Sequence, residues 1–125
     1  MAAVLHLSAR PGFRLTVVDL EPLRATIRAA GELDLAAKGP LAELLEQQQV
    51  AGRRVVSLDL SEVTFLDCSC VGVLVAAHHR FLELRGLLVL TDVDARVARI
   101  LRATGPDDSL FITPAVARPS RPRAS

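Results

Sequence analysis

The chain has 125 residues, a formal net charge of +1 and a half-apolar composition without Trp or Tyr. This length fits one domain with a single core of aliphatic side chains. The balanced charge and the lack of aromatic platforms argue against a nucleic-acid-binding function.

The pattern also argues against membrane insertion and export. The longest apolar run, Cys70 to Ala77, is far below the roughly 20 residues that a membrane-spanning helix needs. The first residues lack the basic-then-apolar order of a secretory signal. Two cysteines separated by one residue do not make a disulfide framework, so we expect a cytoplasmic protein with reduced thiols.

The first half of the chain predicts two strands and a helix. Residues 13–20 and 23–34 alternate in polarity on either side of Asp19-Leu20-Glu21-Pro22, which indicates a β-hairpin. Asp34 follows at a strand-to-helix boundary. A helix is expected to end at Gly52 after a short first turn near Gly39-Pro40, with apolar spacing carried by Leu41, Leu44, Leu45 and Gln48.

The second half predicts alternating strands and helices. Residues 54–60 indicate a central buried strand, and residues 87–92 and 109–113 indicate two more. An amphipathic helix is expected to begin at Asp67 and to end near Arg85-Gly86, and a second to follow the cap Asp94 and end at Gly105. The apolar side of the first helix is predicted to hold Val71, Leu74, Val75, His78, Phe81 and Leu82, with His79 in solvent.

This order predicts an α/β fold with a central mixed sheet of about five strands. The hairpin is followed by parallel β-α units, with three or four helices mainly on one face. We expect three segments: an N-terminal segment 1–12, a domain 13–116, and a disordered Arg- and Pro-rich tail 117–125.

The stretch "FLDCSC" carries the candidate site. Asp67 or Ser69 at the helix start is expected to cap free backbone N–H groups, and the same position favours an anion such as phosphate. Cys68 at a helix N-terminus would be a reactive thiol if exposed, although a small buried cysteine that fills a gap is the more frequent case.

Other chemistries have little support in the residue inventory. The pair Cys68 and Cys70 has no second pair at zinc-like spacing, so no metal site is expected. Ser69 has no placed base and lies in no G-x-S-x-G motif, and there is no glycine-rich phosphate loop. We therefore expect no cofactor and no enzymatic activity.

The segment "VVSLDLSEVTFLDCSCVGVLVAAHHR" resembles the signature of the STAS domain of bacterial anti-sigma factor antagonists. That signature is a strand ending in D-L-S, an apolar link, and D-S-S-G-L-G-x-L opening a helix. Asp59-Leu60-Ser61 and Phe65-Leu66-Asp67 match it directly. "GELD", residues 31–34, and "VARILRATGPDDSLFI", residues 97–112, resemble further family elements in order and spacing.

The resemblance implies a domain that acts by binding another protein. In the family, the domain captures an anti-sigma factor that is also a GHKL-type serine kinase and so releases a sigma factor. The kinase then phosphorylates the first serine of D-S-S-G, and the phosphate ejects the partner. The resemblance carries over the partner-binding positions Asp34, Asp67, Cys68, Ser69, Cys70 and Gly72.

The sequence departs from the family at the phosphorylated position. Cys68 stands in place of the first serine, Ser69 keeps the second, and Cys70 replaces the following glycine, whereas Gly72 keeps the second glycine. Three alternatives stay open: a phosphorylation-independent antagonist, a phospho-acceptor shifted to Ser69, or a thiol switch at Cys68 in place of phosphate.

Two other functions also stay open: a thiol-based redox-sensing module, and an accessory subunit of a lipid-transporting membrane ATPase. The prolines of the tail exclude the extra C-terminal helix that many family members have. Exposed apolar surface would then be free for a partner or for a dimer.

Overall fold

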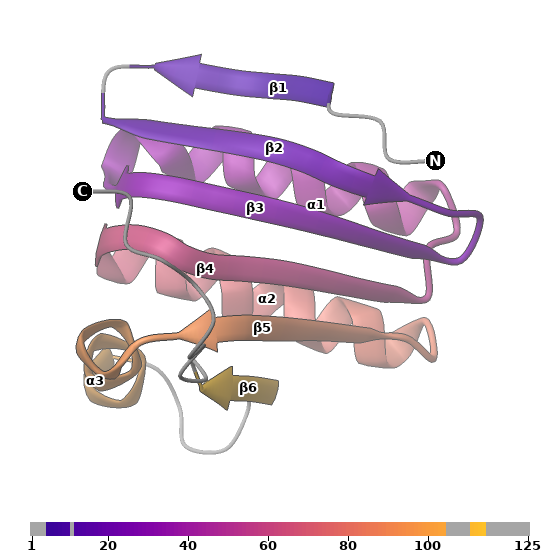
Figure 1. The fold of residues 1–125 in the computed structure, drawn as a ribbon. Helices are drawn as coiled ribbons and strands as arrows, with labels where there is room; N and C mark the ends of the chain where they lie inside the picture. The colour runs from indigo at the N-terminus through magenta and orange to yellow at the C-terminus, as the bar shows by residue number, and fades with distance from the viewer. Residues whose placement is uncertain (1–4, 11, 105–110, 115–125) are drawn as a thin grey trace, which may run out of the picture.

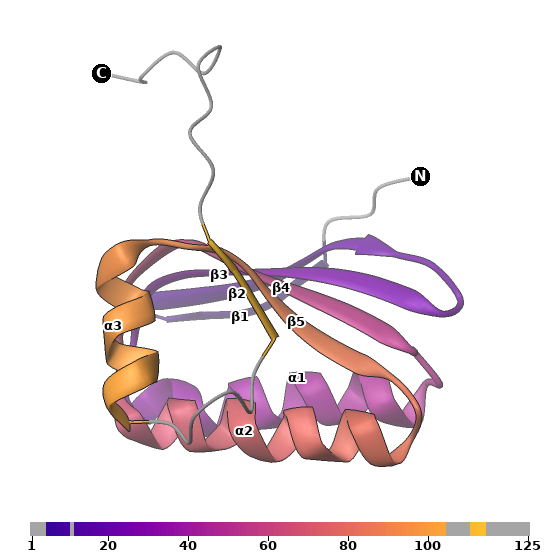
Figure 2. The ribbon, with the colours of Figure 1, turned by 90° about the horizontal axis from the view of Figure 1, so that it is seen from below.

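The computed structural model describes residues 5–10, 12–104 and 111–114 as a two-layer α/β fold. Figure 1 shows a sheet with its strands in chain order and helices behind it, and Figure 2 shows α1 and α2 together below one face of the sheet. The expected α/β class, the mixed sheet and the mainly one-sided helical cover are confirmed. In the described part of the chain, no helix is long and apolar enough to span a bilayer.

Within the described residues the sheet has six strands, one more than the roughly five strands that the sequence predicts. They are β1 (Leu5–Arg10), β2 (Phe13–Leu20), β3 (Arg24–Leu33), β4 (Val55–Leu66), β5 (Leu87–Val93) and β6 (Phe111–Pro114). β2 pairs with β3 in the predicted antiparallel hairpin, and β3 to β6 are parallel. The unpredicted β1 pairs antiparallel with β2 at the sheet edge, so residues 5–10 are part of the sheet. β1 was not predicted because it has six residues and pairs on one side, so it shows only a short alternation of apolar and polar residues.

The helices follow the parallel strands. A 3-10 turn, η1 (Leu35–Ala37), precedes α1 (Lys38–Val50); α2 spans Cys68–Glu83 and α3 spans Ala95–Thr104. The expected break in the first helix lies at the junction of η1 and α1, while Gly39 and Pro40 fall inside the first turn of α1. The predicted stop at Gly105 and the tail 117–125 lie outside the described residues.

β4 is six residues longer at its C-terminal end than the predicted strand 54–60. The register between β3 and β4 shifts after Arg28 and again after Gly31. Beyond Leu60, two exposed residues therefore separate successive buried ones, Val63 and Leu66. This irregularity breaks the period-two alternation that identifies a strand in sequence. The extension is important because it carries the candidate site to the carboxyl end of β4.

The aliphatic core lies between the sheet and the two large helices. The predicted helical stripes are confirmed for Leu41, Leu44, Leu45 and Gln48 on α1, and for Val71, Leu74, His78 and Phe81 on α2. The prediction that Leu82 belongs to the apolar side of α2 is wrong, because its side chain is 45% exposed. His78 is buried and His79 is exposed, as expected.

Candidate functional site

Two adjacent parallel strands end side by side and place the site residues at one corner of the sheet. Leu33 at the end of β3 lies opposite Leu66 at the end of β4. Asp34 and Asp67 are therefore neighbours across the two strand ends. The N–H of Asp67 donates to the Leu33 carbonyl at 2.9 Å, and this bond holds the two chain segments together.

Each of these aspartates caps a helical segment. Asp34 Oδ1 accepts from the N–H of Ala36 at 3.0 Å and starts η1. Asp67 Oδ1 accepts from the N–H of Ser69 at 2.7 Å and starts α2. This hydrogen bond is the largest influence that holds the pKa of Asp67 below its ordinary value, so the carboxylate stays charged. The predicted capping role is borne out for Asp67 and not for Ser69.

The two cysteines have opposite environments. Cys70 is fully buried, and its Sγ donates to the Asp34 carbonyl at 3.3 Å. Burial, helped by the Asp67 carboxylate, raises the pKa of Cys70 to about 11, so this thiol stays protonated. Cys68 is exposed in the first turn of α2. The buried, gap-filling role that was expected for Cys68 is therefore wrong, and Cys70 has that role.

Ser69 and Gly72 complete the set of predicted residues. Ser69 Oγ is shielded from solvent and lies against the carboxylate of Asp67. Gly72 is exposed on the first turns of α2, and a Cβ built there meets no atom within 4 Å. The corner therefore presents a thiol at Cys68 and an unobstructed helix surface at Gly72, whereas the Ser69 hydroxyl faces inward.

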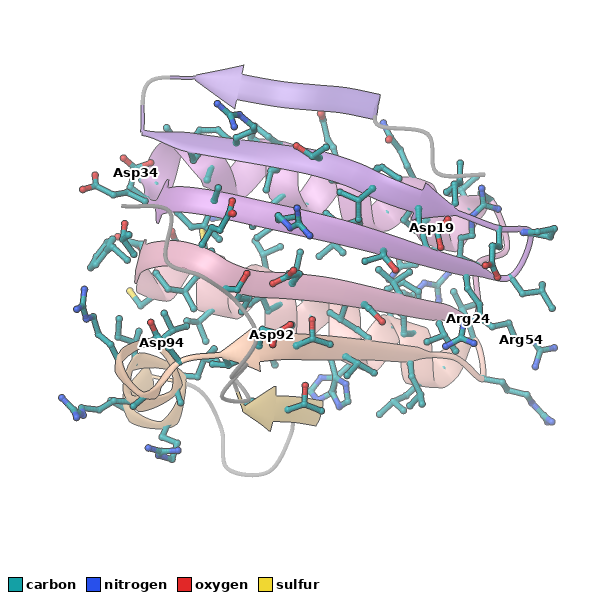
Figure 3. All side chains as sticks on the ribbon, in the orientation of Figure 1. Asp19, Arg24, Asp34, Arg54, Asp92 and Asp94 are labelled. Carbon is teal, nitrogen blue, oxygen red and sulfur yellow. The ribbon has the colours of Figure 1, made fainter. Side chains whose placement is uncertain are left out.

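Charged side chains of both signs lie at each end of the molecule, because α3, with Arg96, Arg99 and Arg102, lies at the same end as Asp34 (Figure 1). Figure 3 labels Asp34 and Asp94 at this end, Asp92 nearer the middle of the sheet, and Asp19, Arg24 and Arg54 at the opposite end. Among the residues that the structure describes, no group of three or more His, Cys, Asp or Glu side chains has a metal-binding arrangement.

A model of the STAS domain matches residues 16–118. The chain belongs to the STAS domain family. The matched region begins three residues after, and ends two residues beyond, the domain bounds 13 and 116 expected from the sequence.

Curated relatives of this STAS domain are anti-sigma factor antagonists. The chain is 34% identical over 86 residues to the anti-sigma-B factor antagonist of Listeria monocytogenes, and the match covers 69% of this chain and 75% of that protein. The anti-sigma-B factor antagonist of Listeria innocua matches equally.

Solved structures agree on the fold. An anti-sigma factor antagonist from Mycobacterium paratuberculosis has a TM-score of 0.71 at 21% identity, covering 86% of this chain and 91% of that one. Unphosphorylated SpoIIAA, an anti-sigma factor antagonist, has a TM-score of 0.64 at 16% identity, covering 82% and 89%. A serine-to-glutamate variant of RsbS from Moorella thermoacetica has a TM-score of 0.61 at 20% identity, covering 92% and 87%.

Two apolar residues of this STAS domain were not predicted as site residues. Leu35 is 68% exposed directly after Asp34, and Phe65 is 44% exposed two residues before Asp67. The sequence held a signal for the exposure of Leu35. This residue lies in η1, and it does not continue the helical spacing of the buried residues Leu41, Leu44, Leu45 and Gln48 on α1. Phe65 had no such signal, because it was assigned to a connecting link instead of a strand. Both side chains lie within three residues of the caps Asp34 and Asp67, so they add exposed apolar area near the two strand ends.

Proposed function

We propose that this STAS domain is an anti-sigma factor antagonist that binds its partner through the corner around Cys68. The partner is an anti-sigma factor of the GHKL serine-kinase type, and its capture releases a sigma factor in the cytoplasm. The curated relatives support this class of function. The observation that carries the site is the exposed Cys68 thiol on a corner already fixed by two caps and the bond between Asp67 and Leu33.

Each site residue has a distinct role in the proposal. Asp34 and Asp67 fix the two strand ends, and the Cys70 thiol fills the space between them. Cys68 and Gly72 form the contact surface, because small side chains let a partner approach the helix start closely. Ser69 contributes its backbone N–H to the cap instead of its hydroxyl to the surface.

The replacement of serine by cysteine makes the binding independent of phosphorylation. A phosphate adds a charge of about −1.5 to −2, which an interface built around a small neutral group does not accommodate. A serine kinase does not modify the Cys68 thiol, and Ser69 Oγ is shielded from solvent. The proposed antagonist therefore stays in its binding-competent form in the presence of the kinase.

Phosphate analysis by mass spectrometry tests this reading. The wild type, Ser69→Ala, Cys68→Ser and the double variant Cys68→Ser/Ser69→Ala are incubated with the captured kinase and ATP. We expect the wild type and Ser69→Ala to stay unmodified, and both variants that carry the Cys68→Ser change to gain one phosphate on the new serine. A phosphate on Ser69 of the wild type would contradict the proposal and favour a shifted acceptor.

A bulky substitution on the open helix surface tests the docking site. Gly72→Arg is expected to fold normally, because a Cβ at this position meets no atom within 4 Å. It should weaken capture of the anti-sigma factor by at least about tenfold, a loss of about 1.4 kcal/mol. Gln47→Arg, at an exposed position near the end of α1, is the matched control and should bind as the wild type does. Equal binding by Gly72→Arg would place the interface elsewhere.

A further inference from the structure

The pairing of β3 with β4 is irregular over the stretch that leads to the site corner. Arg28 of β3 lies opposite Asp59 of β4. The next aligned pair is Ala30 and Glu62, so two residues of β4 face one residue of β3 between these pairs. This arrangement is a β-bulge, a feature that bends a strand and changes the direction of the side chains beyond it. A second register shift follows after Gly31.

The first bulge determines which side chains of β4 enter the core. Buried residues alternate with partly exposed ones up to Leu60, and continued alternation would turn the carboxylate of Glu62 toward the core. With the bulge, Glu62 is exposed and Val63 is buried instead. The bulge therefore spares the core an unpaired charge, whose burial is strongly unfavourable.

The two register shifts also set the position of the site corner. Without them, the upstream pairing would place Thr64 opposite Leu33, where the structure has Leu66. Asp67 would then lie two residues, about 7 Å, further along the strand. Its N–H could not donate to the Leu33 carbonyl, and this hydrogen bond joins the two strand ends. The extra residues of β4 thus bring the start of α2 to its observed place.

The side chain of Asp59 fixes the first bulge. A bulge interrupts the backbone ladder, and Asp59 Oδ1 accepts from the N–H of Ser61 within it at 2.8 Å. Asp59 Oδ2 forms an ion pair with Arg28 Nε at 3.3 Å across the two strands. Burial opposes ionisation of this carboxylate, yet the hydrogen bonds from Ser61 and the contact with Arg28 hold the pKa of Asp59 below its ordinary value. A charged carboxylate therefore connects the bulge to β3 at neutral pH.

We propose that Asp59 is a positioning residue for the Cys68 corner, because it holds the bulge that determines how the end of β4 meets the end of β3. Asp59 lies about 20 Å before Asp67 along β4, outside the contact surface formed by Cys68 and Gly72. It acts on the corner through the main chain of β4. The effect on partner binding rests on the proposed function, whereas the effect on the corner does not.

Hydrogen exchange followed by nuclear magnetic resonance on the full chain tests the positioning without a partner. The Asp67 N–H reports on the corner, and the amides in the middle of α1 report on global opening. In Asp59→Ala we expect the Asp67 amide to exchange at least about tenfold faster relative to the α1 amides. Arg28 is 46% exposed and can turn to solvent, so this variant should fold. Asp59→Asn keeps an oxygen for the Ser61 N–H and should stay within about threefold of the wild type.

Thr91→Ala is the matched control. Thr91 lies opposite Asp59 on β5, and its Oγ1 is 3.5 Å from the Leu58 carbonyl oxygen, so it contacts the other side of β4 and not the bulge. The ratio of Asp67 exchange to α1 exchange should not change in this variant. An equal ratio in Asp59→Ala and the wild type would overturn the proposal, because Asp59 would then contribute only global stability. Exchange as fast in Asp59→Asn as in Asp59→Ala would also overturn it, because the bond to Ser61 would not be what fixes the bulge.

The partner gives a second, separate readout. Asp59→Ala should bind the captured anti-sigma factor at least about fivefold more weakly than the wild type, because a loosely held site binds poorly. Asp59→Asn and Thr91→Ala should stay within about twofold of the wild type. Unchanged binding by Asp59→Ala, together with fast Asp67 exchange, would overturn the link to binding while the positioning stands. If the wild type binds no anti-sigma factor, the proposed function fails, and the exchange comparison still decides the role of Asp59.

Discussion

At the scale of single residues, two thiols separated by one residue have different environments because α2 turns between them. Cys68 faces solvent in the first turn, and Cys70 faces the core and donates to the Asp34 carbonyl. Only the thiolate attacks an alkylating reagent. Position on the helix therefore decides which sulfur is available for chemistry.

We expect Cys68 alone to react with N-ethylmaleimide in the native protein at pH 7.5. Cys70 should stay unmodified, because burial excludes the reagent and a pKa of about 11 keeps the thiol protonated. Peptide mapping after timed quenching measures both sites, and a sample in denaturant, in which both should react, is the control. Rapid native modification of Cys70 would show that the start of α2 opens readily.

The cap at Asp67 gives a second residue-scale prediction. Asp67→Ala removes the acceptor of the Ser69 N–H and should lower the midpoint of urea unfolding, whereas Asp67→Asn keeps a capping oxygen and should lower it less. The relevant readout is the midpoint followed by circular dichroism at pH 7. If the alanine and asparagine variants have the same urea midpoint, the loss of the negative charge at the helix start, and not the loss of the hydrogen bond, explains the lower midpoint.

At the scale of elements, close approach between β3 and the β1–β2 turn depends on one glycine. Gly31 has φ of +86°, and a Cβ there would collide with the backbone carbonyl of Gly12. A side chain at this position would therefore cost both backbone strain and a displacement of the neighbouring turn. The family-like "GELD" stretch thus has a packing reason for its first residue.

Gly31→Ala should lower the free energy of unfolding by at least about 2 kcal/mol, as measured by urea denaturation. Gly52→Ala is the matched control: it has φ of +83° but open space around the added Cβ, and it should cost only about 1 kcal/mol. If the two variants lose similar amounts of unfolding free energy, the turn at Gly12 can move away from the added Cβ at little energetic cost.

Regular elements were predictable from sequence, and irregular ones were not. The stripe that ends at Gln48 identified α1, and the alternation around Ile27 identified β3, because each follows the period of its structure. The end of β4 was missed because register shifts placed two exposed residues between buried ones, and this error also hid Phe65. The burial of each cysteine depends on how the first turn of α2 is oriented toward the core, and the apolar spacing that begins at Val71 does not define that orientation for residues 68–70.

At the scale of the whole molecule, the buried His78 links stability to pH. Burial, with a smaller contribution from His79, lowers the pKa of His78 below its ordinary value of 6.5. Between pH 6.5 and the lower folded value, the unfolded chain binds a proton that the folded chain does not. Stability is therefore fully present above pH 6.5 and is lost as the pH falls through this window.

We expect the free energy of unfolding to decrease from pH 7.5 to pH 5.0, with a slope of at most about 1.4 kcal/mol per pH unit from this group. His78→Leu should remove most of this dependence. The lowered pKa values of Asp59 and Asp67 affect stability only below about pH 3.8, outside the range tested. The free energy of unfolding is measured by urea denaturation at each pH. If its pH dependence is unchanged in His78→Leu, another titrating group causes that dependence.

The hydrogen bond from Asp67 to the Leu33 carbonyl, described above as part of the site geometry, also bears on how such a protein diverges. The frame is built from main-chain atoms and the two caps, and the side chain at position 68 adds a hydrogen bond to the Asp67 carboxylate. Serine and cysteine can both donate this hydrogen bond, so they can be exchanged there without rebuilding the surroundings. A single codon change is then sufficient to give one copy of a duplicated gene a different response to the same upstream signal.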